Sequence, residues 1–237
     1  MKYFLFPVLL SFVLLASVPA RAASGSAHNW TGCYLGANAG ISSSQNRWQD
    51  PTPDGDIDGS GTTNQTAKTD MSGGDYGAQL GCDYQFSSNN VVVGIEGSFD
   101  GSLMSGTNQD EFNSPWTLQA DTRALGALTG RLGWSLDSAP VLFYARGGIA
   151  FAKNKFEITN GGIFDGNPST TLIGWTLAPG IEWAFTPHWS VFTEGDYYSF
   201  GRKTVSFPGD AVNPTPAFQV RTSQDIEALK VGVNYHF

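Results

Sequence analysis

The chain has 237 residues, of which 14% are charged and 13% aromatic, and its formal net charge is −8 at pH 7. Disorder is excluded, because disordered chains combine few aromatic residues with high charge. The acidic balance gives no reason to expect a nucleic acid or an anionic lipid surface as a partner. A chain of this length fits one all-β domain.

The N-terminal residues have the three parts of a secretory signal peptide. Lys2 precedes an apolar run over residues 4–16, and a small-x-small site, Ala-Arg-Ala, follows it. We therefore predict a signal peptide over residues 1–22 and a single barrel domain over residues 23–237. Removal of the signal peptide leaves 11 basic and 21 acidic side chains, which gives a formal charge of −10. No later apolar run approaches the roughly 20 residues that a membrane helix needs.

Eight later segments alternate between apolar and polar residues with a period of two. This pattern is typical of strands that face lipid on one side and a polar lumen on the other. In the first segment, Leu35 and Ile41 fall on the apolar face, and Tyr34 and Asn38 fall on the other. The segments are residues 31–43, 75–86, 91–103, 123–136, 141–156, 171–185, 189–200 and 226–237.

Two of the segments are irregular. Pro179 removes a ladder donor from the sixth segment. The seventh places three aromatic residues, Phe192, Tyr198 and Phe200, on its inward face, which makes it the weakest of the eight predictions.

The connections alternate between short and long, as in outer-membrane barrels with tight periplasmic turns and long extracellular loops. A soluble lipocalin-like barrel would instead carry its apolar face inside. The sequence therefore predicts an all-β fold, an eight-stranded antiparallel transmembrane up-and-down β-barrel with both termini in the periplasm. The tight turns are residues 87–90, 137–140 and 186–188, and the long loops are residues 44–74, 104–122, 157–170 and 201–225.

The first long loop contains Asp54-x-Asp56-x-Asp58-Gly59, which matches the start of a calcium-binding loop. Gln65 occupies the twelfth position, where such a loop needs a bidentate glutamate. A solvated acidic loop is therefore favoured over a calcium site.

Charged residues on the inward faces form the most suggestive group. Paired carboxylates could indicate a hydrolase site, but these carboxylates are accompanied by cations. We favour interior ion pairs that plug the lumen, because an eight-stranded barrel is just wide enough for side chains to fill. The group is Glu96, Arg131, Arg146, Glu182, Glu194 and Lys230.

The chain has three histidines, His28, His188 and His236. None has a serine or acidic partner at a motif spacing, so we expect no catalytic triad and no enzymatic activity. The sequence also has no zinc-ligand spacing, phosphate-binding glycine motif or basic patch, so we expect no cofactor and no nucleic-acid partner.

Short motifs in a fixed order resemble one family. They are Trp30-Thr31-Gly32-x-Tyr34-x-Gly36-x-Asn38-x-Gly40, Gly94-Ile95-Glu96-Gly97, Gly130-Arg131-Leu132-Gly133-Trp134, Tyr144-Ala145-Arg146-Gly147-Gly148-Ile149-Ala150-Phe151, Gly180-Ile181-Glu182-Trp183, Glu194-Gly195-Asp196-Tyr197 and Val231-Gly232-Val233-Asn234-Tyr235-x-Phe237. The chain resembles the alphaproteobacterial outer-membrane immunogenic proteins, small barrels related to opacity proteins and similar in architecture to OmpA-type barrels. The resemblance covers the barrel and not the long loops, and it implies an abundant surface antigen.

Cys33 departs from the aromatic residue expected in relatives. In the barrel, Cys33 and Cys82 lie on the outward faces of neighbouring strands, at similar distances from the periplasmic end. Because antiparallel neighbours have close Cβ atoms, a disulfide between them is geometrically feasible in an exported chain. The alternative is two free thiols.

The predicted function is a structural barrel and surface antigen that contributes to envelope integrity, in contact with outer-membrane lipid and lipopolysaccharide. Its loops could bind host or environmental ligands, although their aromatic residues could equally pack onto the rim. A small-solute porin is the first alternative and requires a lumen free of bulky, paired side chains. A lipid-modifying enzyme is the second and requires a serine, a histidine and an acid clustered at one rim. The loop aromatics are Trp48, Trp116, Phe207 and Phe218.

Overall fold

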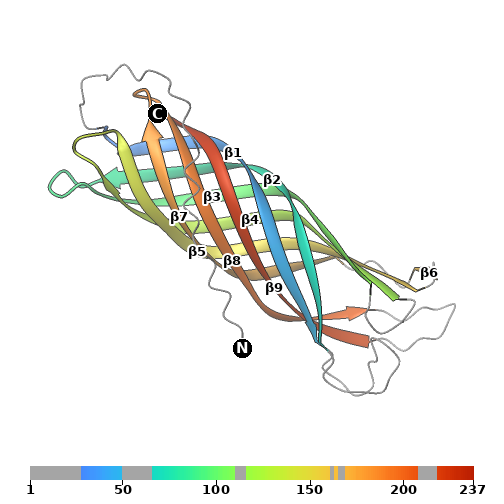
Figure 1. Cartoon of the computed structure of the whole chain (residues 1–237). Helices are drawn as coiled ribbons and strands as arrows, with labels where there is room; N and C mark the ends of the chain where they lie inside the picture. The colour runs from blue at the N-terminus through green and yellow to red at the C-terminus, as the bar shows by residue number, and fades with distance from the viewer. Residues whose placement is uncertain (1–27, 50–65, 110–115, 161–162, 165–168, 208–217) are drawn as a thin grey trace.

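A computed structural model describes residues 28–49, 66–109, 116–160, 163–164, 169–207 and 218–237. Eight long strands and one two-residue strand make up its regular structure, and the predicted signal peptide lies outside the described residues (Figure 1). No helix among the described residues is long and apolar enough to cross a membrane. The strands are β1 (Gly32–Gln49), β2 (Thr66–Gln85), β3 (Val91–Gln109), β4 (Trp116–Ser135), β5 (Val141–Asn160), β6 (Ile163–Phe164), β7 (Ser169–Ala184), β8 (Trp189–Phe207) and β9 (Phe218–His236).

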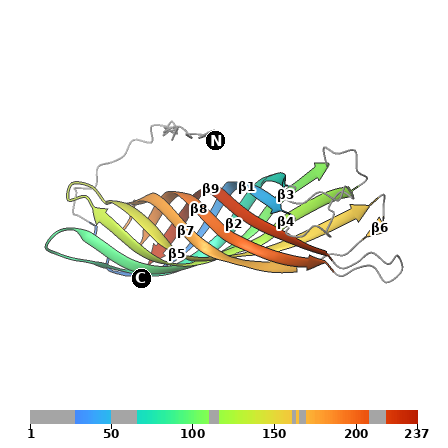
Figure 2. The same cartoon turned by 90° about the horizontal axis from the view of Figure 1, so that it is seen from below.

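The eight long strands form one closed antiparallel barrel. Each pairs with its neighbours along the chain, and β1 pairs with β9, so that Leu35 lies opposite Tyr235. The short strand β6 pairs only with the far end of β5. Figure 2 shows the strands tilted around the barrel. Closure leaves none of the eight long strands at an open edge, which is a requirement in hydrocarbon. The predicted fold class is confirmed.

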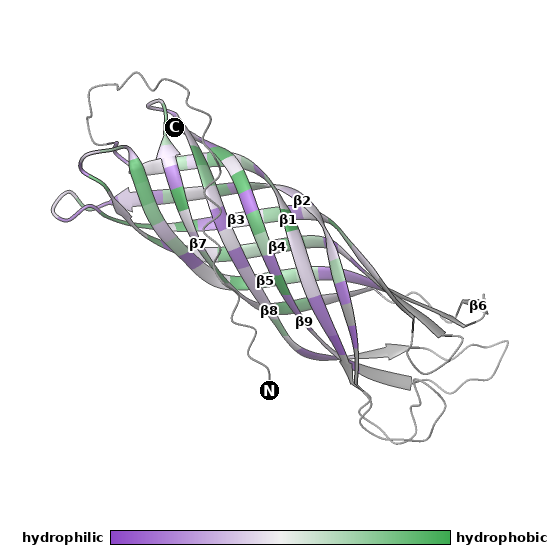
Figure 3. Ribbon diagram, viewed as in Figure 1, coloured by the Kyte–Doolittle hydropathy of each residue, from purple (hydrophilic) through white to green (hydrophobic). Residues whose placement is uncertain are grey.

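Burial alternates along the membrane-spanning part of the eight long strands, as the period-two pattern requires. On β7, Ile173 and Trp175 are exposed on the outside, whereas Leu172 and Thr176 are buried in the lumen. Figure 3 shows the same alternation as hydrophobic and hydrophilic residues along the ribbons. The three aromatic residues that made the seventh prediction weak are also buried inside, as predicted. They are Phe192, Tyr198 and Phe200.

Pro179 is accommodated by a local gap in one ladder. It pairs with Ala145 of β5, but the β7–β8 ladder stops at Leu177 and resumes at Gly180. Because proline has no N–H to donate, the missing pairs fall where its donor is missing.

The strands extend far beyond the segments predicted from sequence. The eight long strands contain 16 to 20 residues, whereas a tilted strand needs only about 9–11 to cross a membrane. The predicted bounds of the four long loops are therefore wrong, because most of the described residues within those bounds continue the ladders. Arg47 of β1, for example, pairs with Lys68 of β2. Beyond the membrane the outward face is polar, so the hydrophobic alternation ends before the backbone pairing does.

The three tight turns lie where they were predicted, after β2, β4 and β7. Asn90 in the first turn has φ 57°, a left-handed conformation that asparagine adopts more readily than most residues. β1 begins and β9 ends at this same end of the barrel (Figure 1). The end with the turns is therefore the periplasmic end.

An apolar band surrounds the periplasmic half of the barrel. Its exposed side chains run from Phe237 to Leu229 on β9, a span of about nine residues that fits one membrane crossing. The next outward residue beyond Leu229, towards the outside of the cell, is the charged Glu227. Exposed aromatic residues lie near both edges of the band, where they suit the two membrane interfaces. They include Trp134, Trp183, Trp189 and Tyr235 near the periplasm and Tyr76, Phe99, Phe151, Trp175 and Tyr197 near the outside.

Candidate functional site

The six charged residues predicted from sequence all lie buried in the lumen. The structure arranges them around three cations at successive heights and brings further residues into each group. Each group combines ion pairs with hydrogen bonds, and the groups follow one another from the periplasmic end outwards.

Arg131 is the cation nearest to the periplasm. Its guanidinium donates to Asp83 at 2.7 Å and also to Glu182. A third contact is made to the hydroxyl oxygen of Tyr34 at 3.3 Å, and the guanidinium carbon lies 3.8 Å from the centroid of the Tyr144 ring. Two carboxylates and two aromatic rings therefore compensate this buried charge.

Arg146 forms the middle group. Its Nε and one terminal nitrogen donate to the two oxygens of Glu194 at 2.7 and 2.5 Å, a bidentate arrangement. The same terminal nitrogen contacts Asp196 at 2.7 Å, and Glu96 lies 3.5 Å from Nε. Glu194 and Glu96 thus share one cation instead of standing as an isolated carboxylate pair.

Lys230 forms the group nearest to the outside. Its ammonium donates to Asp100 at 2.7 Å and to the hydroxyl oxygen of Tyr198 at 3.0 Å. Asp196 lies 3.7 Å away and is shared with Arg146. The middle and outer groups are therefore linked through one carboxylate.

Tyrosine hydroxyls link the inner group to the middle group. Tyr34, which accepts from Arg131, donates to Glu96 at 2.6 Å. Tyr144, whose ring lies under Arg131, donates to Glu194 at 3.0 Å. The three cations thus belong to one continuous network that crosses the lumen and ties together strands distant in sequence.

The lumen contains further carboxylates besides the three that were predicted to pair with cations. Three buried cations stand against seven buried carboxylates among the described lumen residues. The charge group predicted from sequence does not include Asp83, Asp100 and Asp196, although the period-two alternation puts all three on inward faces. Their inward position on alternating strands was the available signal. The seven carboxylates are Asp75, Asp83, Glu96, Asp100, Glu182, Glu194 and Asp196.

Large aromatic side chains fit inside the barrel because glycines face them from the next strand. A Cβ on Gly81 would lie 2.4 Å from the Tyr34 ring, and one on Gly180 would lie 2.4 Å from the Tyr144 ring. Gly232 makes the same room for Phe192. This explains why the inward face of β8 can be aromatic without widening the barrel.

Trp30 lies at the periplasmic end of the lumen, before β1. It is almost fully buried, and its indole N–H donates to Ser135 at 3.0 Å. Its neighbours in the apolar cluster are Val92, Leu142, Tyr144 and Ala184. Sequence reasoning used Trp30 only as part of a motif and missed its position inside this end.

A serine, a histidine and an acid also meet at the periplasmic end, which the sequence did not predict. His236 Nε2 lies 3.0 Å from Ser190 Oγ and 3.2 Å from Glu182 Oε1. In a catalytic triad, the serine and the acid contact different imidazole nitrogens. Here both contact the same nitrogen, and Ser190 itself donates to Glu182. This geometry does not activate the serine hydroxyl as a nucleophile, and Ser190 has no exposed surface.

Neutral polar side chains around Gln224 fill the lumen farther from the periplasm. Gln224 donates to Ser44 and Thr122 at 3.0 and 3.1 Å and accepts from Asn154 at 2.6 Å. Apolar side chains complete this filling. They are Met71, Met104, Leu125, Leu172, Phe200 and Ile226.

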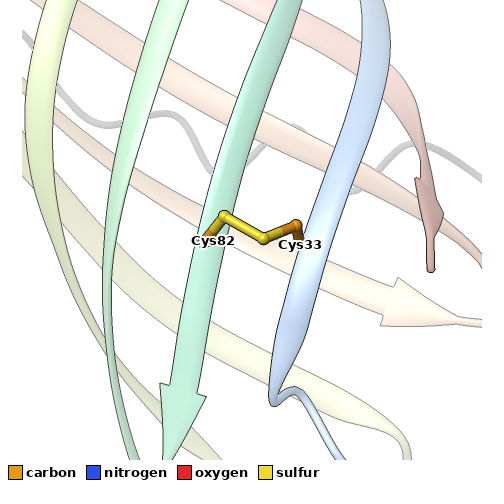
Figure 4. Close-up of a disulfide and its surroundings, with 2 residues drawn as sticks. All are labelled: Cys33 and Cys82. Carbon is orange, nitrogen blue, oxygen red and sulfur yellow. A yellow bond between two sulfur atoms is a disulfide. The ribbon is translucent and has the colours of Figure 1, made fainter.

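Cys33 and Cys82 form the predicted disulfide. They lie directly opposite each other on β1 and β2, on the outward face (Figure 4). The chain has no other cysteine, so the bridge is the one permanent cross-link of the barrel.

The remaining candidates fall outside the described part. The calcium candidates Asp54, Asp56 and Asp58 lie there entirely. The side chains of the four loop aromatics also lie outside it, although Trp48, Trp116, Phe207 and Phe218 belong to strands β1, β4, β8 and β9. Within the described residues, no group of three His, Cys, Asp or Glu side chains is arranged to hold a metal ion.

A closed barrel with an outward apolar band, aromatic edges and a polar lumen defines an integral outer-membrane β-barrel protein. A model of the outer membrane protein β-barrel domain matches residues 9–237, and the chain belongs to this family.

Its relatives are named as outer-membrane antigens. The chain is 27% identical over 216 residues to a 31 kDa outer-membrane immunogenic protein of Brucella melitensis, covering 88% of this chain and 84% of that one. It is 25% identical over 224 residues to a 25 kDa outer-membrane immunogenic protein of Brucella abortus, covering 93% and 85%. The resemblance found from sequence and the outer-membrane location are confirmed.

A solved structure supports the fold. The outer membrane protein OprG of Pseudomonas aeruginosa superposes with a TM-score of 0.61 at 13% identity, covering 89% of this chain and 98% of that one.

Proposed function

We propose that this protein is a closed structural barrel that reinforces the outer membrane and displays the extracellular ends of its strands as an antigenic surface. The single observation that carries the proposal is the filled lumen. The void between the charge groups has a volume of only about 10 Å³, which is about the space that one water molecule needs. A solute-conducting pore or a substrate pocket would need a much larger opening.

Conductance measurements in planar lipid bilayers test the closed lumen. We expect the purified, folded protein to insert without producing steady conductance, whereas a general porin reconstituted in parallel gives stepwise currents. Stepwise opening by the unmodified protein would overturn the proposal in favour of the small-solute porin.

Labelling of intact cells tests the display of the strand ends. Ser72 is exposed on the outer half of β2, and Ser138 is exposed in a periplasmic turn. A membrane-impermeant maleimide should label the Ser72→Cys variant on intact cells and the Ser138→Cys variant only after the outer membrane is permeabilised. The reverse pattern would contradict the proposed orientation.

The cluster of Ser190, His236 and Glu182 gives little support to the alternative that the protein is a lipid-modifying enzyme. Ser190 is fully buried, and His236 uses one nitrogen for both of its partners. This proposal assigns the binding of host or environmental ligands to the outer surface of the strand ends, since the described lumen around the charge groups has no room for a ligand.

A further inference from the structure

Basic side chains are distributed unevenly over the barrel. In the described part of the chain, every lysine and arginine outside the lumen lies beyond the extracellular edge of the apolar band, and the three periplasmic turns contain none. The net charge of the whole chain is −8, so this local concentration of basic residues is not evident from the composition. The basic residues are Arg47, Lys68, Arg123, Lys153, Lys155, Arg202, Lys203 and Arg221.

Three of these cations gather on β4 and β5. Lys153 pairs with Ala124, next to Arg123, and Lys155 pairs with Asp121. Asp121 lies 3.4 Å from Arg123, but the Arg123 side chain remains 59% exposed. Among the side chains described in this part of β4 and β5, one carboxylate therefore stands against three cations, which leaves a local positive charge. We call Arg123, Lys153 and Lys155 the basic cluster.

A fourth cation extends this surface towards β8. The ammonium of Lys203 donates to the backbone carbonyl of Thr171 at 2.5 Å. Thr171 pairs directly with Lys153 across the β5–β7 ladder. The register thus brings cations from β4, β5 and β8 together along neighbouring ladder positions beyond the apolar band.

On the opposite side of the barrel, acidic and basic side chains are mixed beyond the apolar band, since Arg47, Lys68 and Arg221 lie there as well. Asp225 and Glu227 on β9 and Asp70 on β2 line a shallow surface depression together with Arg47. Described cations outnumber described carboxylates on the β4–β8 side, so this side should attract an anion more strongly than the mixed side does.

An apolar groove of about 1000 Å³ lies next to the basic cluster on the wall formed by β3, β4, β5 and β7. Phe99, Gly126 and Phe151 lie in one row across β3, β4 and β5. Because Gly126 has no side chain, the two phenylalanines flank a trough in the lipid-facing wall. The groove is lined by these three residues and also by Arg123, Lys153 and Lys155.

We propose that this surface binds a phosphorylated glycolipid of the outer leaflet, the lipid A anchor of lipopolysaccharide. A phosphate at the basic cluster would accept charge-assisted hydrogen bonds from Arg123 and the two lysines. An acyl chain would lie in the trough over Gly126, at the depth of the apolar band. Charge complementarity and the direct adjacency of cations and trough argue for a lipid phosphate over a soluble one.

The test measures binding of purified lipid A to the intact barrel in detergent micelles by native mass spectrometry. The test variant is Arg123→Gln/Lys153→Gln/Lys155→Gln, and the matched control is Arg47→Gln/Lys68→Gln/Arg221→Gln, which also removes three exposed cations. We expect the test variant to bind bisphosphorylated lipid A about tenfold more weakly and the control to bind it within about twofold of the unmodified protein.

A second variant, Gly126→Phe, fills the trough and leaves the cations in place. A Cβ at Gly126 would make only ordinary contacts, the nearest at 3.5 Å to the Ser98 carbonyl, so the barrel should fold. We expect this variant to bind lipid A more weakly than the unmodified protein. In the unmodified protein, we expect that inorganic phosphate does not compete with lipid A for binding.

Three outcomes would overturn the inference. They are equal losses in the test and control triples, unchanged binding in the test triple, or equally tight binding of dephosphorylated lipid A. None of them would affect the closed-lumen proposal, which depends on conductance and surface labelling.

Discussion

Arg131 lies over the face of the Tyr144 ring, with 3.8 Å between the guanidinium carbon and the ring centroid. The ring in turn occupies the space left by the missing side chain of Gly180 on the neighbouring strand. A cation, an aromatic ring and a glycine from three strands thus fix one another in position. The interior of the barrel is stabilised by such packing as well as by ion pairs.

Gly180→Ala should destabilise the barrel, because the new Cβ would lie 2.4 Å from the Tyr144 ring. We expect a loss of about 1–3 kcal/mol in the free energy of unfolding, as for other overpacked sites. Urea titration in micelles, followed by tryptophan fluorescence, measures it. Gly97→Ala is the control, since nothing lies within 4 Å of its added Cβ; equal stability of the two variants would refute the packing argument.

Arg131→Met should destabilise more strongly, because it leaves Asp83 and Glu182 buried without their cation. Breaking a buried ion pair on one side costs about 3–5 kcal/mol. The same urea titration applies, with the exposed Arg47→Met as the control. A loss below about 1 kcal/mol, typical of exposed pairs, would show that the network contributes little.

Cys33→Ser/Cys82→Ser should fold but unfold more easily. The disulfide joins residues 49 positions apart, and cross-links of this kind stabilise by about 2–4 kcal/mol. The measurement is the temperature at which the unboiled form disappears on a detergent gel, compared with the unmodified protein. No change in that temperature would indicate that the bridge is dispensable for stability.

The stability of the periplasmic end should decrease in acid through His28, which lies before β1 and outside the membrane-spanning strands. Burial, with a smaller contribution from His236, lowers the pKa of His28 below its ordinary value of 6.5. The unfolded chain therefore binds the proton more readily, so the contribution is complete above pH 6.5 and is lost as the pH falls through that value.

Unfolding midpoints at about pH 8 and about pH 5 test this dependence. The decrease on acidification should be smaller in His28→Gln than in the unmodified protein. His188→Gln serves as a comparison for histidine loss in general. An identical decrease in His28→Gln and the unmodified protein would assign the acid sensitivity to other groups.

The membrane-spanning part of the fold was predictable from sequence because lipid and lumen impose opposite demands on alternate residues. Leu35 and Tyr34 are adjacent in the chain, yet one is exposed and the other fully buried. The extracellular strand ends were not predictable, because there the outward face contacts water and no longer needs apolar residues. The ladder places Arg47 opposite Lys68, and no hydrophobic alternation in the sequence marks that pairing.

The candidate site was predictable in its members but not in its connections. Alternation placed Arg146 and Glu194 inside, but the pairing of a residue on β5 with one on β8 depends on their heights in the barrel. The cluster of Ser190 and His236 was missed for the same reason, since 46 residues separate them in sequence. Three-dimensional register decides which inward residues meet.

The continuation of the ladders above the membrane has a consequence for immune recognition. Neighbouring residues on this surface come from different strands, as Arg47 and Lys68 do. Antibodies raised against the folded protein will therefore bind epitopes assembled across strands, and a synthetic peptide copied from one strand will reproduce little of any such epitope. A vaccine based on this surface requires the folded barrel and not its fragments.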